Sequence, residues 1–220
     1  MAIILARMGH DLILVARRQK LLHDLKNELV EQYKVNVRVI AADLGAAGDC
    51  RALYEQTRND AVDILVNNAG FGLSGPFDQT RLDLELEMID VNIRAVHVLT
   101  KLFLVDFKRQ NRGYILNVSS SAGFLPGPLM STYYASKAYV LHLSQAIWEE
   151  LSQAKSKVYI GALCPGPVKT GFNQTAKVPH DSGRGISSQY AAEYAIRKMF
   201  LRKRVRSEEH TSELQSRHNL

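Results

Sequence analysis

The segment that decides the fold is Val62-Asp63-Ile64-Leu65-Val66-Asn67-Asn68-Ala69-Gly70. Its apolar first half predicts a buried strand, and the polar residues that follow predict a turn at Asn67. Strands of the same kind are predicted at 11–17, 35–41, 114–118 and 158–163, and helical patterns lie between and after them at 19–33, 50–57, 82–107, 131–152 and 188–201. Strands that alternate with helices indicate an α/β fold in three layers, the Rossmann-like doubly wound parallel sheet.

The longest predicted helix, 82–107, carries apolar residues at helical spacing. A single helix is predicted over the whole range, with one face buried against the sheet. The residues expected on this buried face are Leu82, Leu86, Ile89, Ile93 and Val96.

Polar or turn-forming residues follow each predicted strand. The carboxyl ends of parallel strands meet at one edge of a sheet, and ligands bind there in open α/β folds. A single polar residue after a strand need not indicate a binding site, because loops are polar in general. Five of them together predict a binding cleft, and its residues are Arg17, Asp43, Asn67, Ser119 with Ser120, and Pro165.

A second pattern, Tyr133-Tyr134-Ala135-Ser136-Lys137, lies at the start of the predicted helix 131–152. Residues four apart lie side by side on a helix, so we expect the Tyr133 phenol beside the Lys137 ammonium. A neighbouring cation favours the ionised phenol, which predicts a lowered tyrosine pKa and proton exchange near neutral pH. For this spacing alone, a solvated helix face is the alternative.

Three further motifs stand in a fixed order with this pattern: Asn67-Asn68-Ala69-Gly70, Asp90-Val91-Asn92, and Asn117-Val118-Ser119-Ser120-Ser121-Ala122-Gly123. Together they resemble the classical division of the short-chain dehydrogenase/reductase family, and the resemblance covers about residues 1–205. It implies hydride transfer between a nicotinamide cofactor and a carbonyl or secondary alcohol. The catalytic residues that it implies are Asn92, Ser120, Tyr133 and Lys137.

The resemblance also implies a role for each of these side chains. Tyr133 donates the proton in reduction, and Lys137 lowers its pKa and holds the nicotinamide ribose. Ser120 hydrogen-bonds the substrate oxygen, and Asn92 supports a water chain that replenishes the proton. Neighbours that lack the right spacing are expected to pack or cap, and these are Ser119, Ser121 and Tyr134.

The same resemblance places the cofactor along the carboxyl edge of the sheet, with an acidic residue beside the adenine and a proline-rich loop over the nicotinamide. The cofactor-binding residues that it implies are Asp43, Leu44, Asn67, Ala69, Gly70, Tyr133, Lys137, Pro165, Gly166, Val168 and Thr170. No metal site is expected, because the two cysteines and seven histidines show no metal-ligand spacing.

Arg17 and Arg18 bear on the choice of nicotinamide cofactor. Enzymes that select NAD place an acidic residue at the end of this strand, where it accepts hydrogen bonds from the adenine-ribose hydroxyls. Two guanidinium groups suit the 2′-phosphate of NADP instead. We therefore expect NADP rather than NAD, with a surface arginine pair as the alternative.

The substrate side of the predicted cleft is apolar. Residues 71–77 and 171–185 are expected to line it, with Phe71, Leu73, Phe172 and Val178 among them. These side chains favour a hydrophobic ketone, a 3-oxoacyl thioester or a steroid-like alcohol. The alternative functions are a catalytically inert truncated fragment and a cofactor-binding or interaction protein.

Both ends of the chain depart from the family pattern. The family opens with a strand and a TGxxxGxG turn that approaches the cofactor pyrophosphate, whereas residues 1–9 already read as the end of a helix. We expect this strand, which would lie between 11–17 and 62–66, and the last strand to be absent. Residues 206–220 resemble a translated sequencing adapter, so we predict one domain at 1–205 and a non-native, disordered tail.

Composition and charge fit a single domain, since 46% of the 220 residues are hydrophobic. No apolar run reaches membrane-spanning length, so no membrane partner is expected. The net charge is +6, and the basic run 197–206 is interpreted as a solvated helix end rather than a nucleic-acid site. A cytoplasmic location, a small carbonyl or alcohol substrate and a homo-oligomeric parent protein are expected.

Overall fold

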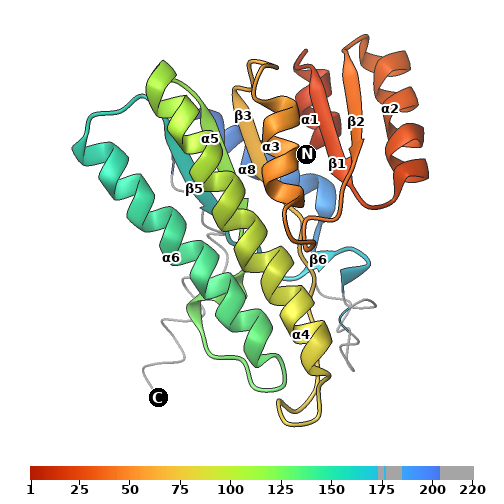
Figure 1. Cartoon of the computed structure of the whole chain (residues 1–220), viewed down its shortest axis with the longest axis vertical. Helices are drawn as coiled ribbons and strands as arrows, with labels where there is room; N and C mark the ends of the chain where they lie inside the picture. Colours follow the sequence, from red (N-terminus) through yellow and green to blue (C-terminus); the bar gives the residue numbers. More distant parts are fainter. Residues whose placement is uncertain (173–175, 177–184, 204–220) are drawn as a thin grey trace.

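A computed structural model describes residues 1–172, 176 and 185–203 of the chain (Figure 1). Its central strands are all parallel and each overlaps a predicted one: β1 (Leu12–Ala16), β2 (Val37–Ala41), β3 (Ile64–Asn67), β4 (Tyr114–Val118) and β5 (Tyr159–Leu163). A short parallel pair, β6 (Val168–Lys169) and β7 (Ile186–Ser187), follows them. The predicted α/β fold with a parallel sheet is confirmed.

Helices cover both faces of the strands and complete three layers (Figure 1). One face packs on α3 (Asp49–Thr57), α5 (Val96–Gln110) and α6 (Ser131–Gln153), and their shared core includes Phe107, Ile115 and Ile160. The other face packs on α1 (Ala2–Arg7), α2 (Gln19–Tyr33) and α8 (Ser188–Phe200). This burial holds the carboxyl ends of the strands in place.

The five central strands form two hydrogen-bonded pieces rather than one sheet. Among the described residues β1 pairs only with β2, and the other piece runs in the order β3, β4, β5. A groove of about 1500 Å³ lies between β1 and β3 and is lined by residues of both strands. It occupies the position predicted for an absent central strand, and the flanking strands have not closed up on each other.

The predicted helix 82–107 contains a change of pitch. α4 (Leu82–Ile89) continues into a π-helical turn, Asp90–Ala95, and then into α5. The predicted buried face is wrong in the first two turns, because Leu82 and Leu86 are 69% and 50% exposed. Met88 faces the core instead. The wider π turn rotates α4 relative to α5, so a single helical period does not describe both.

The two ends of the chain differ in what the structure describes. α1 ends at Arg7, and Gly9 follows with φ +85°, which is the predicted helix stop. The region of the expected last strand and the tail 206–220 lie outside the described residues, so the domain boundary stays a prediction. None of the helices in the described part is both long and apolar enough to cross a bilayer.

Candidate active site

The carboxyl ends of β4 and β5 meet the start of α6 at one edge of the sheet. The backbone N–H of Ser121 donates to the carbonyl oxygen of Pro165 at 2.8 Å, which joins the loops after these two strands. The Ser120 side chain caps the 3₁₀ turn Ser121–Phe124 and accepts from the Ala122 N–H at 3.1 Å. These contacts fix the position of Ser120 at the carboxyl end of β4.

Tyr133 and Lys137 lie side by side on α6, and both are buried. Lys137 Nζ is 5.8 Å from the centre of the Tyr133 ring and donates to the carbonyl oxygen of Val118 at 3.0 Å. The side chain of Ser120 is close enough to the Tyr133 hydroxyl to lower its pKa. The structure therefore brings together the serine, tyrosine and lysine that the sequence predicted.

The pKa values of this pair correct one expectation. Burial raises the pKa of Tyr133 above its ordinary value, and the hydrogen bond with Ser120 lowers it by a smaller amount. The predicted lowering by Lys137 is not found. Burial also lowers the pKa of Lys137 to about 8, because a site shielded from water disfavours the charged form of each group. Tyr133 is therefore protonated at neutral pH.

Lys137 makes a testable contribution to the pH dependence of stability. Its pKa is about 8 in the folded chain and 10.5 when unperturbed, so between these values the unfolded chain binds more protons. The free energy of unfolding should therefore rise from pH about 8 to about 10. Lys137→Met should remove this rise, which urea titrations at several pH values would measure. A rise that persists in the variant would contradict the assignment.

Asn92 lies fully buried in the π turn and ties the loop after β3 to α6. Its Nδ2 donates to the Phe71 carbonyl oxygen at 2.9 Å and to Ser136 Oγ at 3.0 Å, and its Oδ1 accepts from the Phe71 N–H at 3.1 Å. Ser136 Oγ donates in turn to the Tyr133 carbonyl oxygen at 2.7 Å. The amide thus positions α6. Ser136 was assigned no role from the sequence, although it lies between Tyr133 and Lys137.

Gly70 tests whether a nicotinamide cofactor suits this edge of the sheet. A Cβ at Gly70 would lie 3.0 Å from Asn92 Oδ1 and 3.3 Å from Lys137 Nζ. Ala69 and Gly70 are exposed. A flat molecule that lies on this glycine comes within reach of the buried ammonium, so the residues present fit a cofactor whose ribose hydroxyls meet Lys137.

Asn67 plays a structural part with its side chain. Nδ2 donates to Asn117 Oδ1 at 2.8 Å and to Thr100 Oγ1 at 3.1 Å, and Asn117 Nδ2 donates to Ser144 Oγ at 3.0 Å. This buried network fastens β3 and β4 to α5 and α6. The side-chain nitrogen of Asn67 is therefore committed to the fold. Thr100 and Ser144 carried no signal in the sequence, because only the fold brings them to Asn67.

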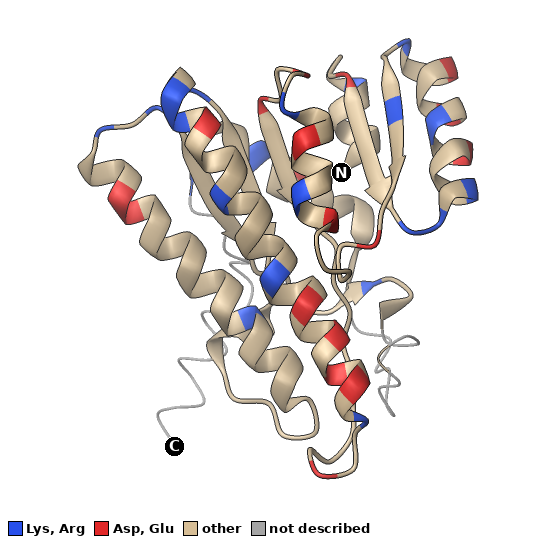
Figure 2. Cartoon of the chain, viewed as in Figure 1, with Lys and Arg blue, Asp and Glu red and all other residues tan. Residues whose placement is uncertain are grey.

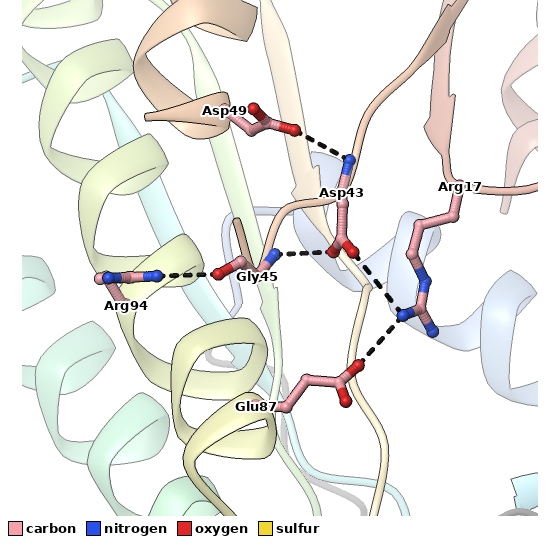
Figure 3. Close-up of polar contacts among 6 residues, drawn as sticks. All are labelled: Arg17, Asp43, Gly45, Asp49, Glu87 and Arg94. Atoms are coloured by element: carbon pink, nitrogen blue, oxygen red, sulfur yellow. Dashed lines mark hydrogen bonds and ion pairs between the residues drawn. The ribbon is translucent and has the colours of Figure 1, made fainter. Parts of the chain in front are cut away.

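The other end of the predicted cofactor site lies beyond β1 and β2 (Figure 3). Arg17 NH1 is 3.0 Å from Glu87 Oε1 on α4 and 3.8 Å from Asp43 Oδ2. Asp43 Oδ1 accepts from the Gly45 N–H at 3.0 Å, and the Asp43 N–H donates to Asp49 Oδ2 at 3.1 Å. The sequence predicted Arg17 and Asp43 here, whereas Glu87 was missed.

The remaining predicted cofactor residues lie in flanking loops. Arg18 is exposed just before α2, and Leu44 packs on the core next to Asp43. The loop after β5 runs into β6, and Thr170 Oγ1 accepts from the Phe172 N–H at 3.2 Å. The predicted residues of this loop are Pro165, Gly166, Val168 and Thr170, and all but Thr170 are partly buried.

Apolar side chains surround the Tyr133 ring, as predicted for a substrate pocket. Phe172 lies with its ring centre 5.1 Å from that of Tyr133. Phe71 and Leu73 pack in the same cluster. Val178, which was also predicted, lies outside the described residues. The tyrosine that can donate a proton therefore lies in a hydrophobic cluster.

The chain is similar in sequence to known proteins. The sequence pattern of the short chain dehydrogenase family matches residues 1–180. A very-long-chain 3-oxoacyl-CoA reductase from Anas platyrhynchos is 34% identical over 186 residues, which are 80% of this chain and 58% of the relative. Hydroxysteroid dehydrogenase-like protein 1 from Gallus gallus is 31% identical over 194 residues, which are 87% and 57%. The chain spans less than two thirds of the length of these relatives.

Solved structures agree with the sequence matches. A short-chain dehydrogenase from Sphingobium yanoikuyae in complex with NADPH has a TM-score of 0.89 at 31% identity, covering 99% of this chain and 86% of the other. A bulky-bulky ketone specific alcohol dehydrogenase from Comamonas testosteroni has a TM-score of 0.84 at 30% identity, covering 99% and 84%. With the family pattern matched over most of its length, this chain belongs to the short-chain dehydrogenase family.

Proposed function

We propose that the chain is the catalytic part of an NADP-dependent oxidoreductase that acts on a hydrophobic carbonyl compound or secondary alcohol. The observation that carries this proposal is the convergence of Ser120, Tyr133 and Lys137 beside an apolar cluster. A protonated phenol, a hydroxyl and a buried ammonium are the groups that carbonyl reduction needs around the substrate oxygen.

The roles of the side chains follow from their surroundings. A bound nicotinamide supplies the hydride. Tyr133, which burial keeps protonated at neutral pH, donates its phenolic proton to the substrate oxygen. Ser120 donates a hydrogen bond to the same oxygen and stabilises its developing charge. Lys137, whose pKa is about 8, holds the ribose and returns a proton to the tyrosinate.

The proton that reaches Lys137 comes from solvent in this proposal, and Asn92 supports the water chain. Both functional groups of its side chain are engaged with Phe71 and Ser136. We therefore expect Asn92 to hold water through its backbone, in the π turn. Such turns are frequent at functional sites because they alter the helical hydrogen-bond pattern.

The proposed substrate is a bulky hydrophobic carbonyl compound, with a 3-oxoacyl thioester as the first choice and a steroid-like alcohol as the second. Phe71, Leu73 and Phe172 beside Tyr133 support an apolar acyl or ring system. The matched relatives also carry the names of a 3-oxoacyl-CoA reductase and of a hydroxysteroid dehydrogenase-like protein. Cytoplasmic location and homo-oligomeric assembly stay predictions from the sequence.

The decisive experiment measures NADPH oxidation by a catalytically competent form of the protein with a panel of carbonyl compounds. The panel contains 3-oxoacyl thioesters of increasing chain length, a ketosteroid and a small polar ketone. We expect kcat/KM to rise with the apolar size of the substrate, since each buried methylene group contributes about 0.8 kcal/mol to binding. A higher kcat/KM for the polar ketone would contradict the proposed substrate class, and no turnover with any compound would contradict the proposed function.

The NADP preference rests on Arg17. In a catalytically competent form of the protein, Arg17→Asp should shift the preference from NADP toward NAD, because a carboxylate repels the 2′-phosphate and accepts from the ribose hydroxyls. The ratio of kcat/KM with the two cofactors measures the shift. Arg18→Asp makes the same charge change at the neighbouring residue and serves as the comparison. An unchanged ratio in Arg17→Asp would place the preference elsewhere.

A further inference from the structure

Arg17 is held by carboxylates from two other parts of the chain (Figure 3). Its NH1 nitrogen lies 3.0 Å from Glu87 Oε1 and 3.8 Å from Asp43 Oδ2. The side chains of Arg17 and Glu87 are 60% and 40% exposed, so the pair lies in contact with water. The same guanidinium is the group proposed to bind the 2′-phosphate of NADP. A phosphate and two carboxylates therefore have to share one set of N–H donors.

The two carboxylates are held differently. Asp43 is fixed to its own loop, because Oδ1 accepts from the Gly45 N–H and its own N–H donates to Asp49. Glu87 extends from α4, which Figure 2 shows to be rich in acidic residues, and it makes the shorter contact with Arg17. Of the two carboxylates, Glu87 engages NH1 more directly.

We propose that Glu87 is a specificity-determining residue that competes with the 2′-phosphate for Arg17. This inference rests on the proposed NADP-dependent function. A phosphate that binds NH1 has to displace Glu87 Oε1 or share the nitrogen with it, and it also meets the negative charge of that carboxylate. A ribose with a free 2′-hydroxyl does not have to displace Glu87 and is not repelled by its charge. Glu87 therefore reduces the discrimination between the 2′-phosphorylated cofactor and its unphosphorylated counterpart.

The size of the effect follows from exposure. Ion pairs between exposed side chains are weak and are screened by salt, so the competition changes affinity severalfold rather than a hundredfold. The effect should also shrink as the salt concentration rises, because it consists of charge interactions in water.

Glu87→Gln tests the proposal, because it keeps the size of the side chain and removes its charge. The probes are adenosine 2′,5′-bisphosphate and adenosine 5′-monophosphate, which differ only in the 2′-phosphate and need no pyrophosphate site. Calorimetry on a monodisperse, catalytically competent form of the protein should show the bisphosphate bound about three- to fivefold more tightly by the variant, with the monophosphate changed by less than about 1.5-fold.

Glu193→Gln is the matched control. Glu193 pairs with Arg7 at 3.3 Å and is 41% exposed, so the variant removes one charge from a comparable exposed pair. Arg7 precedes β1, whereas Arg17 follows it, so the control site lies at the other end of the strand. Both probes should bind to Glu193→Gln as they bind to the unchanged chain. Equal tightening in the two glutamine variants would overturn the proposal, since net charge alone would explain it.

Arg17→Gln separates this inference from the proposed function. If the bisphosphate binds better than the monophosphate, and Arg17→Gln abolishes that difference while Glu87→Gln leaves it unchanged, the inference fails and the NADP assignment stands. If the unchanged chain and Glu87→Gln both bind the bisphosphate no better than the monophosphate, the NADP assignment fails and the inference fails with it.

Discussion

Tyr133→Phe is expected to lower kcat/KM for carbonyl reduction by about a hundredfold or more while the fold is retained. The phenyl ring keeps the contact with Phe172, whose ring centre lies 5.1 Å away, and loses only the hydroxyl. That hydroxyl is protonated at neutral pH because burial raises its pKa. NADPH oxidation with an apolar ketone measures the loss, in a form of the protein that turns over the substrate.

Tyr134→Phe provides the control for this experiment. Tyr134 is the next residue on α6, is partly buried in the same cluster, and packs edge-on against Tyr133. Its change to phenylalanine removes the same atom one position away, so activity should stay within about threefold of the unchanged protein. Near-normal turnover in Tyr133→Phe, or an equal loss in both variants, would show that Tyr133 is not the proton donor.

Filling the groove between β1 and β3 is the second change for which we expect a large effect. Among the described residues these strands pair only on their far sides, with β2 and β4. Unpaired backbone groups at apolar strand edges are costly when buried and promote association when exposed. We therefore expect the chain 1–220 by itself to aggregate and to bind NADP weakly or not at all.

An extension ahead of Met1 tests this expectation. A five-residue apolar strand joined through a TGxxxGxG turn should fill the groove, because Met1 and Ala2 line it. Its glycines would place backbone N–H groups around the pyrophosphate. A glycine-serine extension of the same length is the control. We expect the extension with the strand and the turn to restore NADP affinity and monodispersity, and the glycine-serine extension to restore neither. Micromolar NADP binding by a monodisperse, unextended chain would contradict the prediction.

Local patterns determined the elements well. The predicted helix 19–33 agrees with α2 at both ends, and Leu22 and Leu29 on it are buried. The same reasoning placed Tyr133 beside Lys137, because a four-residue separation on a helix fixes the neighbourhood of two side chains whatever the rest of the chain does. Alternation of strands and helices similarly predicted a parallel sheet with its polar strand ends at one edge.

Helical periodicity failed where tertiary packing altered the backbone. The π turn before α5 rotated α4, so Leu82 and Leu86 became exposed, while Glu85 is buried with its carboxylate bonded to Thr80 and Thr132. A hydrophobic pattern does not reveal a buried carboxylate whose oxygens accept hydrogen bonds from two threonine hydroxyls. The buried face of this helix was therefore decided by the fold.

The sequence by itself determined the fold class, the order of the strands along the chain and the residues Ser120, Tyr133 and Lys137. These follow from spacing over a few residues and from a motif order that resembles one family. Only the tertiary structure decided the open groove, the contact of Arg17 with Glu87, and the direction of the Tyr133 pKa. Glu87 lies 70 residues from Arg17 in the sequence, and burial depends on every element packed around a group. Local spacing specifies neither the Arg17–Glu87 contact nor the burial of Tyr133, because both depend on contacts that form only when the chain is folded.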